Sequence, residues 1–176
     1  MCYKKLSLSQ IAYTEEDRLS LFSVYKDMKQ LGYGQYYLIQ DNSPDYIQRL
    51  RDSMPIFDGS YSIHRTTDNS NQLARIHTDN RPAGLNIPIN DCGAGCDTVF
   101  YNPSTLTRII IPNPSMSDSY LSNNPIEECR FTLTMDSAYL LNTHYPHARV
   151  QTSSNDRLFL SMNLCVTYEE ALEYFH

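Results

Sequence analysis

The sequence predicts a mainly β protein: a double-stranded β-helix, or cupin-like jelly roll, with flanking helices and an N-terminal helical segment. Apolar residues in the N-terminal third recur at helical spacing, and from about residue 73 the period changes to two. Eight short strand-like runs follow, most of them separated by Gly, Pro, Asn, Asp or Ser. Short strands of this number after a helical lead-in are typical of a double-sheet jelly roll.

The N-terminal third is expected to contain two helices. Thr14 is a suitable N-cap because three acidic residues follow it, and Gly32 would end that helix. Ser43-Pro44-Asp45 marks the start of the second, with Pro at the first helical position. The expected buried stripes are Leu19, Phe22, Tyr25, Met28 and Leu31 in the first helix and Ile47, Leu50 and Met54 in the second.

The remaining elements follow from alternation and turn residues. We interpret the Tyr-rich run at 32–40 as an edge strand, and the stretch 113–125, which has no apolar period, as a loop and candidate lid. Thr167 and Glu170 form a capping box that starts a short C-terminal helix through Phe175. The strand-like runs are QLARIHTD, GLNIPIN, DTVFYN, LTRIIIP, CRFTLTM, AYLLNT, HARVQT and RLFLSMNLCV.

The 176 residues are expected to form a single domain, with residues 1–70 as helical support, 71–167 as the jelly-roll core and 168–176 as the C-terminal helix. The net charge of −6 and the lack of a basic cluster make a nucleic-acid partner improbable. No apolar run suits a signal peptide or a membrane span. An odd number of cysteines, five, favours reduced thiols, and hence a cytoplasmic protein.

The run ARIHTD places two potential metal ligands on one side of a strand. Side chains alternate between faces, so His77 and Asp79 point the same way, roughly 6–7 Å apart along the backbone. One metal ion can bridge that gap. By itself the pair is weak evidence, because a chain with five His and twenty acidic residues often contains His-x-Asp by chance.

Two residues far downstream strengthen the metal hypothesis. His147 opens one strand, and Arg157 opens the next, where both faces could be covered. A half-buried arginine needs an anionic partner, and a carboxylate fits its planar fork best. Two His and one carboxylate form the facial triad of non-haem Fe(II) oxygenases, which leaves positions open for a co-substrate and O₂. His144 is the rival distal ligand, whereas His64 is expected at the surface.

These four residues resemble the motif of the Fe(II)/2-oxoglutarate-dependent oxygenase superfamily: His-x-Asp/Glu, a long gap, His, and Arg or Lys about ten residues later. HARVQTSSNDR resembles the aspartyl/asparaginyl- and prolyl-hydroxylase branches, and GLNIPIN with DTVFY resembles small bacterial and phage-type members. The resemblance covers roughly residues 73–166. It implies that His77, Asp79 and His147 ligate Fe(II) and carry the catalysis, and that Arg157 pairs with the distal carboxylate of 2-oxoglutarate.

The implied reaction uses O₂ to hydroxylate a C–H bond of an amino acid, a peptide side chain or a small metabolite, releasing succinate and CO₂. The chain departs from the pattern at Phe159, where many relatives have Ser or Thr to help hold the carboxylate. Tyr101 and Asn86, on strands expected to border the pocket, are candidates to compensate. Tyr101 could equally be wall packing, and Asn86 could satisfy a backbone group.

Other functions remain open at this point. A non-catalytic jelly-roll module could retain metal or ligand binding as a sensor or structural protein. A cupin isomerase or lyase has no need of Arg157, and a halogenase would lack Asp79. Nucleic-acid demethylation fits the acidic charge less well than a small or peptidic substrate. Cys92-Gly-Ala-Gly-Cys96 is half a zinc site at best, and we interpret it as a glycine-rich connection with free thiols.

Overall fold

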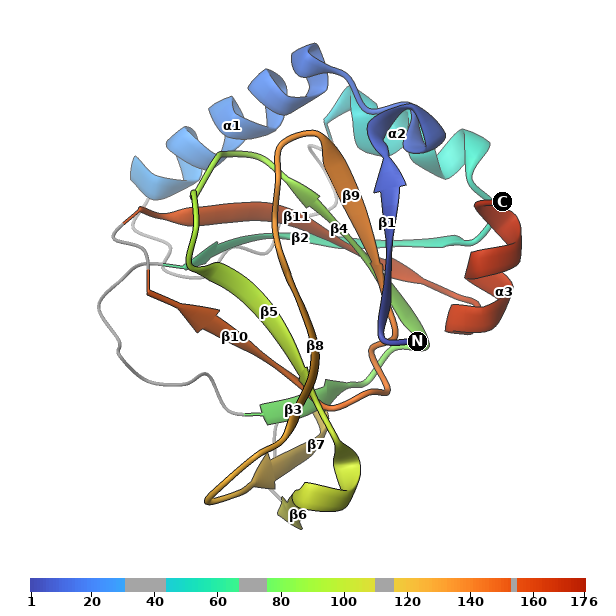
Figure 1. The fold of residues 1–176 in the computed structure, drawn as a ribbon. Coiled ribbons are helices and arrows are strands. Elements are labelled where there is room, and N and C mark those ends of the chain that lie inside the picture. The colour runs from blue at the N-terminus through green and yellow to red at the C-terminus, as the bar shows by residue number, and fades with distance from the viewer. Residues whose placement is uncertain (31–43, 67–75, 110–115, 153–154) are drawn as a thin grey trace.

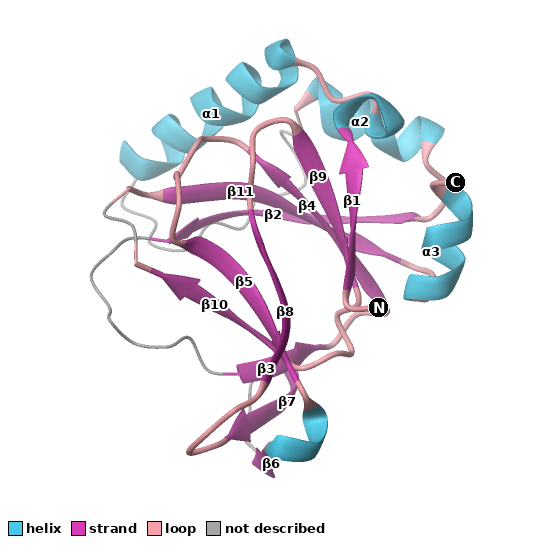
Figure 2. Cartoon of the chain, viewed as in Figure 1, coloured by secondary structure: helices cyan, strands magenta, loops and turns pink. Residues whose placement is uncertain are grey.

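The computed structural model describes residues 1–30, 44–66, 76–109, 116–152 and 155–176 (Figures 1 and 2). Within these ranges most residues in regular secondary structure lie in two antiparallel sheets flanked by helices, which confirms the predicted mainly β class. No helix in the described ranges is long and apolar enough to cross a membrane.

The five-stranded sheet has the order β1-β9-β4-β11-β2. The strand β11 lies between β4 and the edge strand β2, and both neighbours run antiparallel to it. The bounds are β1 (Tyr3–Ser7), β9 (Ser137–Leu141), β4 (Ala83–Pro88), β11 (Arg157–Leu164) and β2 (Phe57–Thr66).

The six-stranded sheet has the order β6-β7-β3-β10-β5-β8. It brings the two predicted metal-bearing strands, β3 and β10, next to each other although about seventy residues separate them in the chain. The bounds are β6 (Thr107–Ile109), β7 (Met116–Leu121), β3 (Ile76–Asp79), β10 (His147–Gln151), β5 (Cys96–Tyr101) and β8 (Glu127–Thr132).

The five-stranded sheet is covered on both faces. Its outer face packs against α1 (Glu15–Gln30), α2 (Asp45–Ser53) and α3 (Tyr168–Tyr174) in the main apolar core (Figure 1). Its inner face meets the six-stranded sheet, where an aromatic cluster around Phe100, Phe131 and Phe159 joins the two. The strand β11 supplies both layers, as its alternation predicts: Leu158, Leu160, Met162 and Leu164 face the helices, and Arg157, Phe159, Ser161 and Asn163 face the other sheet.

The helices α1 and α3 begin where the capping residues predict, whereas Pro44, predicted as the first helical residue of α2, is its N-cap. Thr14 and Asp17 bond reciprocally at the start of α1, and Thr167 and Glu170 do so at α3. The predicted stripe of α1 is wrong at Leu19, which is 54% exposed, whereas Leu21 is fully buried. Asp17 is buried at the start of the helix. Leu21 and Tyr25, four and eight residues later, lie on the same face of the helix and are buried as well. The side chain of Met28 and residues 31–43, including the predicted edge strand, lie outside the described part.

The predicted stripe of α2 is confirmed, because Ile47, Leu50 and Met54 are all buried. The description of residues 1–70 as helical support is incomplete, because two strands that were not predicted from the sequence, β1 and β2, lie within them. The strand β1 is a short edge strand with two lysines, so its sequence shows little apolar alternation. The strand β2 does alternate, with Tyr61 and Ile63 in the main apolar core and His64 on the inner face.

The predicted loop at 113–125 is wrong over Met116–Leu121, which form β7. This polar segment is a strand because its backbone pairs with β3, opposite Ile76, His77 and Thr78. Backbone hydrogen bonding, not burial of apolar side chains, therefore places it in the sheet. Residues 122–125 are irregular, as predicted.

Candidate metal centre

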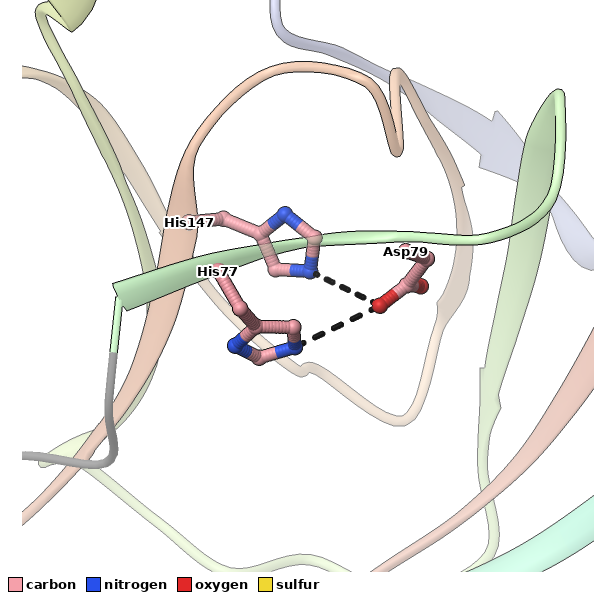
Figure 3. A group of neighbouring side chains, drawn as sticks. All are labelled: His77, Asp79 and His147. Atoms are coloured by element: carbon pink, nitrogen blue, oxygen red, sulfur yellow. Dashed lines mark ion pairs between the residues drawn. The ribbon is translucent and has the colours of Figure 1, made fainter. Parts of the chain in front are cut away.

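Three potential metal ligands converge on the inner face of the six-stranded sheet. His77 and Asp79 alternate onto one face of β3, and His147 lies directly opposite His77 on β10. One ligand atom from each residue lies within 4.8 Å of the others (Figure 3). Asp79 Oδ1 lies 3.3 Å from His77 Nε2 and 3.7 Å from His147 Nε2. Two imidazoles and a carboxylate on one face could hold a single cation.

The second ring nitrogen of His147 fixes the orientation of that side chain. Its Nδ1 lies 2.9 Å from the carbonyl oxygen of Tyr145, which can only accept, so Nδ1–H is the donor. The Nε2 lone pair is then directed at Asp79 and is available to a metal. Burial lowers the pKa of His147 to about 4, so the ring is neutral at pH 7, as ligation requires.

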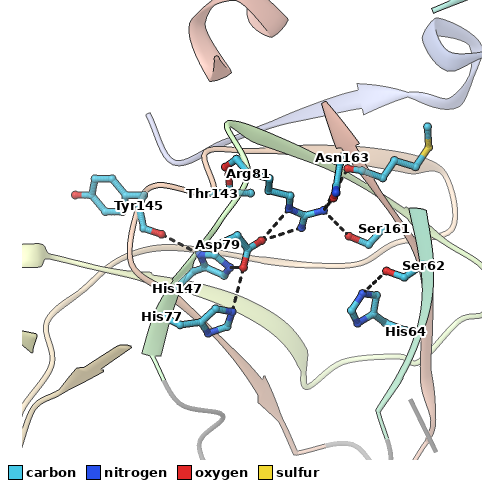
Figure 4. A network of polar contacts seen from close by, with 11 residues as sticks. Ser62, His64, His77, Asp79, Arg81, Thr143, Tyr145, His147, Ser161 and Asn163 are labelled. Atoms are coloured by element: carbon cyan, nitrogen blue, oxygen red, sulfur yellow. Dashed lines mark hydrogen bonds and ion pairs between the residues drawn. The ribbon is translucent and has the colours of Figure 1, made fainter. Parts of the chain in front are cut away.

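Arg81 occupies one oxygen of the Asp79 carboxylate. Its Nε and Nη2 both lie 2.9 Å from Oδ2. Its Nη1 donates to Ser161 Oγ at 3.0 Å and to Asn163 Oδ1 at 2.8 Å on the facing sheet (Figure 4). Burial would raise the pKa of Asp79, but the hydrogen bond from His77 and the charge of Arg81 outweigh it and hold that pKa well below its usual range.

The contacts of Arg81 define how Asp79 can bind. With Oδ2 engaged, only Oδ1 is turned toward the two histidines, so the carboxylate offers one ligand atom. Gly84 gives Arg81 the space it needs, since a Cβ there would lie 2.8 Å from the arginine Cζ. Thr143 holds the backbone nearby, accepting from the Asp79 amide through its carbonyl and donating to the Arg81 carbonyl at 2.6 Å.

Arg157 lies between the sheets and is more deeply buried than the sequence predicts, at 1% exposure. It donates to the carbonyl of Asp97 at 3.1 Å and to Thr98 Oγ1 at 2.8 Å, and its guanidinium lies 4.9 Å from the centre of the Phe159 ring. Burial lowers its pKa to about 10, so it is charged at pH 7. Among the described residues its Nε has no hydrogen-bond partner, and no carboxylate forms an ion pair with it.

The two residues expected to assist Arg157 lie apart. Asn86 is on the inner face of the five-stranded sheet, in register with Ser161, and its buried Oδ1 has no partner in the described part of the chain. Tyr101 lies on the face opposite the three potential ligands, which corrects the prediction that it borders their site. Its neighbour Phe100 pairs with His147, so alternation turns Tyr101 to the opposite face, where it packs with Val99 and Ala148.

His64 is not the surface residue that the sequence predicts. It is half-buried on β2, its Nε2 lies 2.6 Å from Ser62 Oγ, and its ring stacks on Phe159 with centroids 5.0 Å apart. Burial lowers its pKa to about 4. The alternation of Tyr61, Ser62, Ile63 and His64 could have placed it on an inner face. The rival ligand His144 is exposed and stands outside the ligand cluster.

The cysteine pair makes a local contact. The Cys96 thiol donates to the Cys92 carbonyl at 3.5 Å, and both residues are buried. Burial raises the pKa of Cys92 to about 12, so its thiol is protonated at pH 7. Across the described ranges the only cluster of three potential metal ligands is that of His77, Asp79 and His147.

Comparison with known proteins bears on the fold. No protein-family model and no curated protein matches the sequence. A prolyl-4-hydroxylase from Pseudomonas putida is similar in structure, with a TM-score of 0.53 and 10% sequence identity over 93% of this chain and 86% of that one. IDO from Bacillus thuringiensis is similar with a TM-score of 0.43 and 13% identity over 92% and 89%. The chain therefore shares its fold with the hydroxylase. At 10% sequence identity the similarity shows the fold alone.

Proposed function

We propose that the chain is an Fe(II)/2-oxoglutarate-dependent dioxygenase built on a double-stranded β-helix. In this proposal it hydroxylates a C–H bond of an amino acid, a peptide side chain or a small metabolite, and releases succinate and CO₂. The observation that carries the proposal is the convergence of His77, Asp79 and His147 within 4.8 Å of one another. The shared fold with a prolyl-4-hydroxylase supports it.

The donor set fits iron. Two neutral imidazole nitrogens and one carboxylate oxygen suit Fe(II), and three ligand atoms on one side leave the other positions accessible. His77, Asp79 and His147 would hold the metal, and Arg81 would keep Asp79 to a single ligand atom. When bound, iron with 2-oxoglutarate and O₂ supplies the oxidising chemistry, while the chain supplies orientation and a dry pocket.

The interior also fits a ligand with a carboxylate. Arg157 is a fully buried cation with an unsatisfied Nε, and an anion in front of it would remove that cost. Arg157 would therefore hold the distal carboxylate of 2-oxoglutarate. Asn86 is level with Ser161, a contact of Arg81, so its amide would meet the part of the co-substrate nearer the metal.

The aromatic cluster between the sheets would exclude water from the reaction. Phe100 lies 5.6 Å from the His147 ring between centroids, and Phe159 lies beneath the Arg157 guanidinium. These rings belong to the buried cluster that joins the two sheets. Low local polarity strengthens the ion pair of Arg81 with Asp79, would strengthen one between Arg157 and the co-substrate, and would limit access of solvent to the metal.

Calorimetric titration of 2-oxoglutarate into protein saturated with Mn(II) tests the proposal, because Mn(II) does not support turnover. The wild type is expected to bind one 2-oxoglutarate per chain. His77→Ala is expected to abolish Mn(II)-dependent binding, and His144→Ala, a matched change at an exposed histidine, is expected to leave it intact. Undiminished binding in His77→Ala would refute the ligand assignment. Binding of iron and 2-oxoglutarate without succinate release from any substrate would favour the non-catalytic module.

A further inference from the structure

Arg149 reaches the same part of the interior as Arg157. It lies two residues beyond His147 on β10, so its side chain is on the inner face of the six-stranded sheet. Its partner across the ladder is Thr98 on β5, and the Thr98 hydroxyl accepts from Arg157 Nη2 at 2.8 Å. One arginine from each sheet therefore lies beside Thr98. Arg157 donates a hydrogen bond to it, and Arg149 is its partner in the β-ladder.

Arg149 and Arg157 differ from six other arginines in having no carboxylate partner in the parts of the chain that the structure describes. Arg149 is half-buried and makes no hydrogen bond or ion pair there, and the Nε of Arg157 has no partner. Six other arginines each pair with a carboxylate: Arg18 with Glu15, Arg49 with Asp17, Arg65 with Asp156, Arg81 with Asp79, Arg108 with Asp118, and Arg130 with Glu127 and Asp97.

The charges of Arg149 and Arg157 act on each other. Burial, and then the positive charge of Arg149, lower the pKa of Arg157, and Arg149 is itself half-buried beside Thr98 in the ladder. Two cations held near each other and partly out of water repel and lose hydration. An anion bound by both would offset these costs, so the pair has the charge and placement of an anion site.

An anion site at Arg149 and Arg157 would also compensate for Phe159, which stands where many members of the oxygenase superfamily have Ser or Thr. The residue two positions after Arg157 is Phe159, which offers no hydroxyl, and Tyr101 lies on the face opposite the three potential metal ligands. Asn86 is level with Ser161, four residues along β11 from Arg157 and roughly 13 Å away along the strand. Arg149, on the facing sheet, is a charged donor that can take the place of the missing hydroxyl.

We propose that Arg149 and Arg157 together bind one carboxylate, and that this is the carboxylate of 2-oxoglutarate farther from the metal. The inference rests on the proposed function and adds a residue that determines which 2-oxo acid is accepted. Because the two guanidiniums come from facing sheets, the ligand would connect both sheets through one group. The pocket would select 2-oxo acids with a second carboxylate over those without one.

The test compares two ligands by calorimetric titration into Mn(II)-saturated protein: 2-oxoglutarate, and 2-oxovalerate, which has the same chain length without the second carboxylate. The wild type is expected to prefer 2-oxoglutarate. Arg149→Met is expected to weaken 2-oxoglutarate binding about 10- to 100-fold, as for loss of a charged hydrogen bond, and to leave 2-oxovalerate within about twofold. Arg149→Lys should recover part of the preference. Arg108→Met, at an exposed arginine, is the matched control.

The outcomes separate this inference from the proposed function. If Arg157→Met weakens 2-oxoglutarate binding and Arg149→Met does not, Arg149 is no part of the clamp, and a carboxylate of the primary substrate becomes its candidate partner. Equal weakening of both ligands by Arg149→Met would show a structural effect and would also overturn the inference. If the wild type binds Mn(II) but neither 2-oxo acid, the proposed function itself falls.

Discussion

Arg81 binds one oxygen of Asp79 and leaves the other facing the two histidines. Oδ2 receives Nε and Nη2 at 2.9 Å, whereas Oδ1 lies 3.3 Å from His77 Nε2. A carboxylate that used both oxygens would occupy one more position on a metal. The Arg81 contact therefore favours a centre that keeps room for a chelating co-substrate and O₂.

Replacing Arg81 by methionine should weaken metal binding. The variant frees Oδ2 and removes the charge that orients Asp79, and loss of such a supporting contact typically costs about 10- to 100-fold in metal affinity. Calorimetric titration with Mn(II) measures it. Arg49→Met, which removes an ion pair to Asp17 in the helical layer, is the matched control and should leave the affinity unchanged. Equal affinities for wild type and Arg81→Met would show that Arg81 does not position the ligand.

Gly84→Ala should act through Arg81. The added Cβ would lie 2.8 Å from Arg81 Cζ, and the arginine cannot move without losing its bonds to Asp79, Ser161 and Asn163. We expect Gly84→Ala to lower the affinity for Mn(II), as Arg81→Met does. The double variant should be no weaker than Arg81→Met alone, because both changes remove one interaction. Additive losses would place the effect of Gly84 elsewhere.

His64 should make the fold sensitive to mild acid. Burial lowers its pKa from 6.5 to about 4, so it is neutral in the fold down to about pH 4, while the unfolded chain takes up a proton below pH 6.5. The unfolded state binds more protons in this window, so the free energy of unfolding falls as pH drops. Between pH 7 and pH 5, His64→Gln should lose roughly 2 kcal/mol less than wild type. Urea titrations at both pH values measure it, and parallel losses would contradict it.

Leu21 and Leu19 offer a matched test of how α1 is oriented. Leu21 is fully buried, whereas Leu19 is 54% exposed. Leu21→Ala should lower the free energy of unfolding by about 2–5 kcal/mol and Leu19→Ala by less than about 0.5 kcal/mol. Denaturant unfolding of the two variants compares them directly. A larger loss of stability for Leu19→Ala than for Leu21→Ala would contradict this orientation and favour the buried stripe that the sequence predicts.

Elements whose own side chains carry the pattern could be predicted from the sequence. The alternation of β11 placed Arg157 and Leu158 on opposite faces, and the i, i+2 spacing placed His77 and Asp79 on one face. The capping residues of α1 and α3 are visible as local hydrogen-bond pairs. Each of these features depends on neighbours within a few residues in the chain.

Features that depend on distant partners could not be read from the sequence. The strand β7 is polar and is ordered by pairing with β3, and the face of Tyr101 is set by the register of β5 against β10. Arg81 becomes important only when β11 brings Ser161 and Asn163 to it. Arg149 gains a role only because Arg157 arrives from the other sheet.

The central claim is that His77, Asp79 and His147 hold one divalent metal. Anomalous diffraction from a crystal soaked in Mn(II) tests it most directly. The account predicts one strong peak about 2.0–2.3 Å from His77 Nε2, Asp79 Oδ1 and His147 Nε2, with Asp79 Oδ2 still bound to Arg81. A peak bound elsewhere, or no peak at this site when Mn(II) saturates the protein in solution, would contradict it.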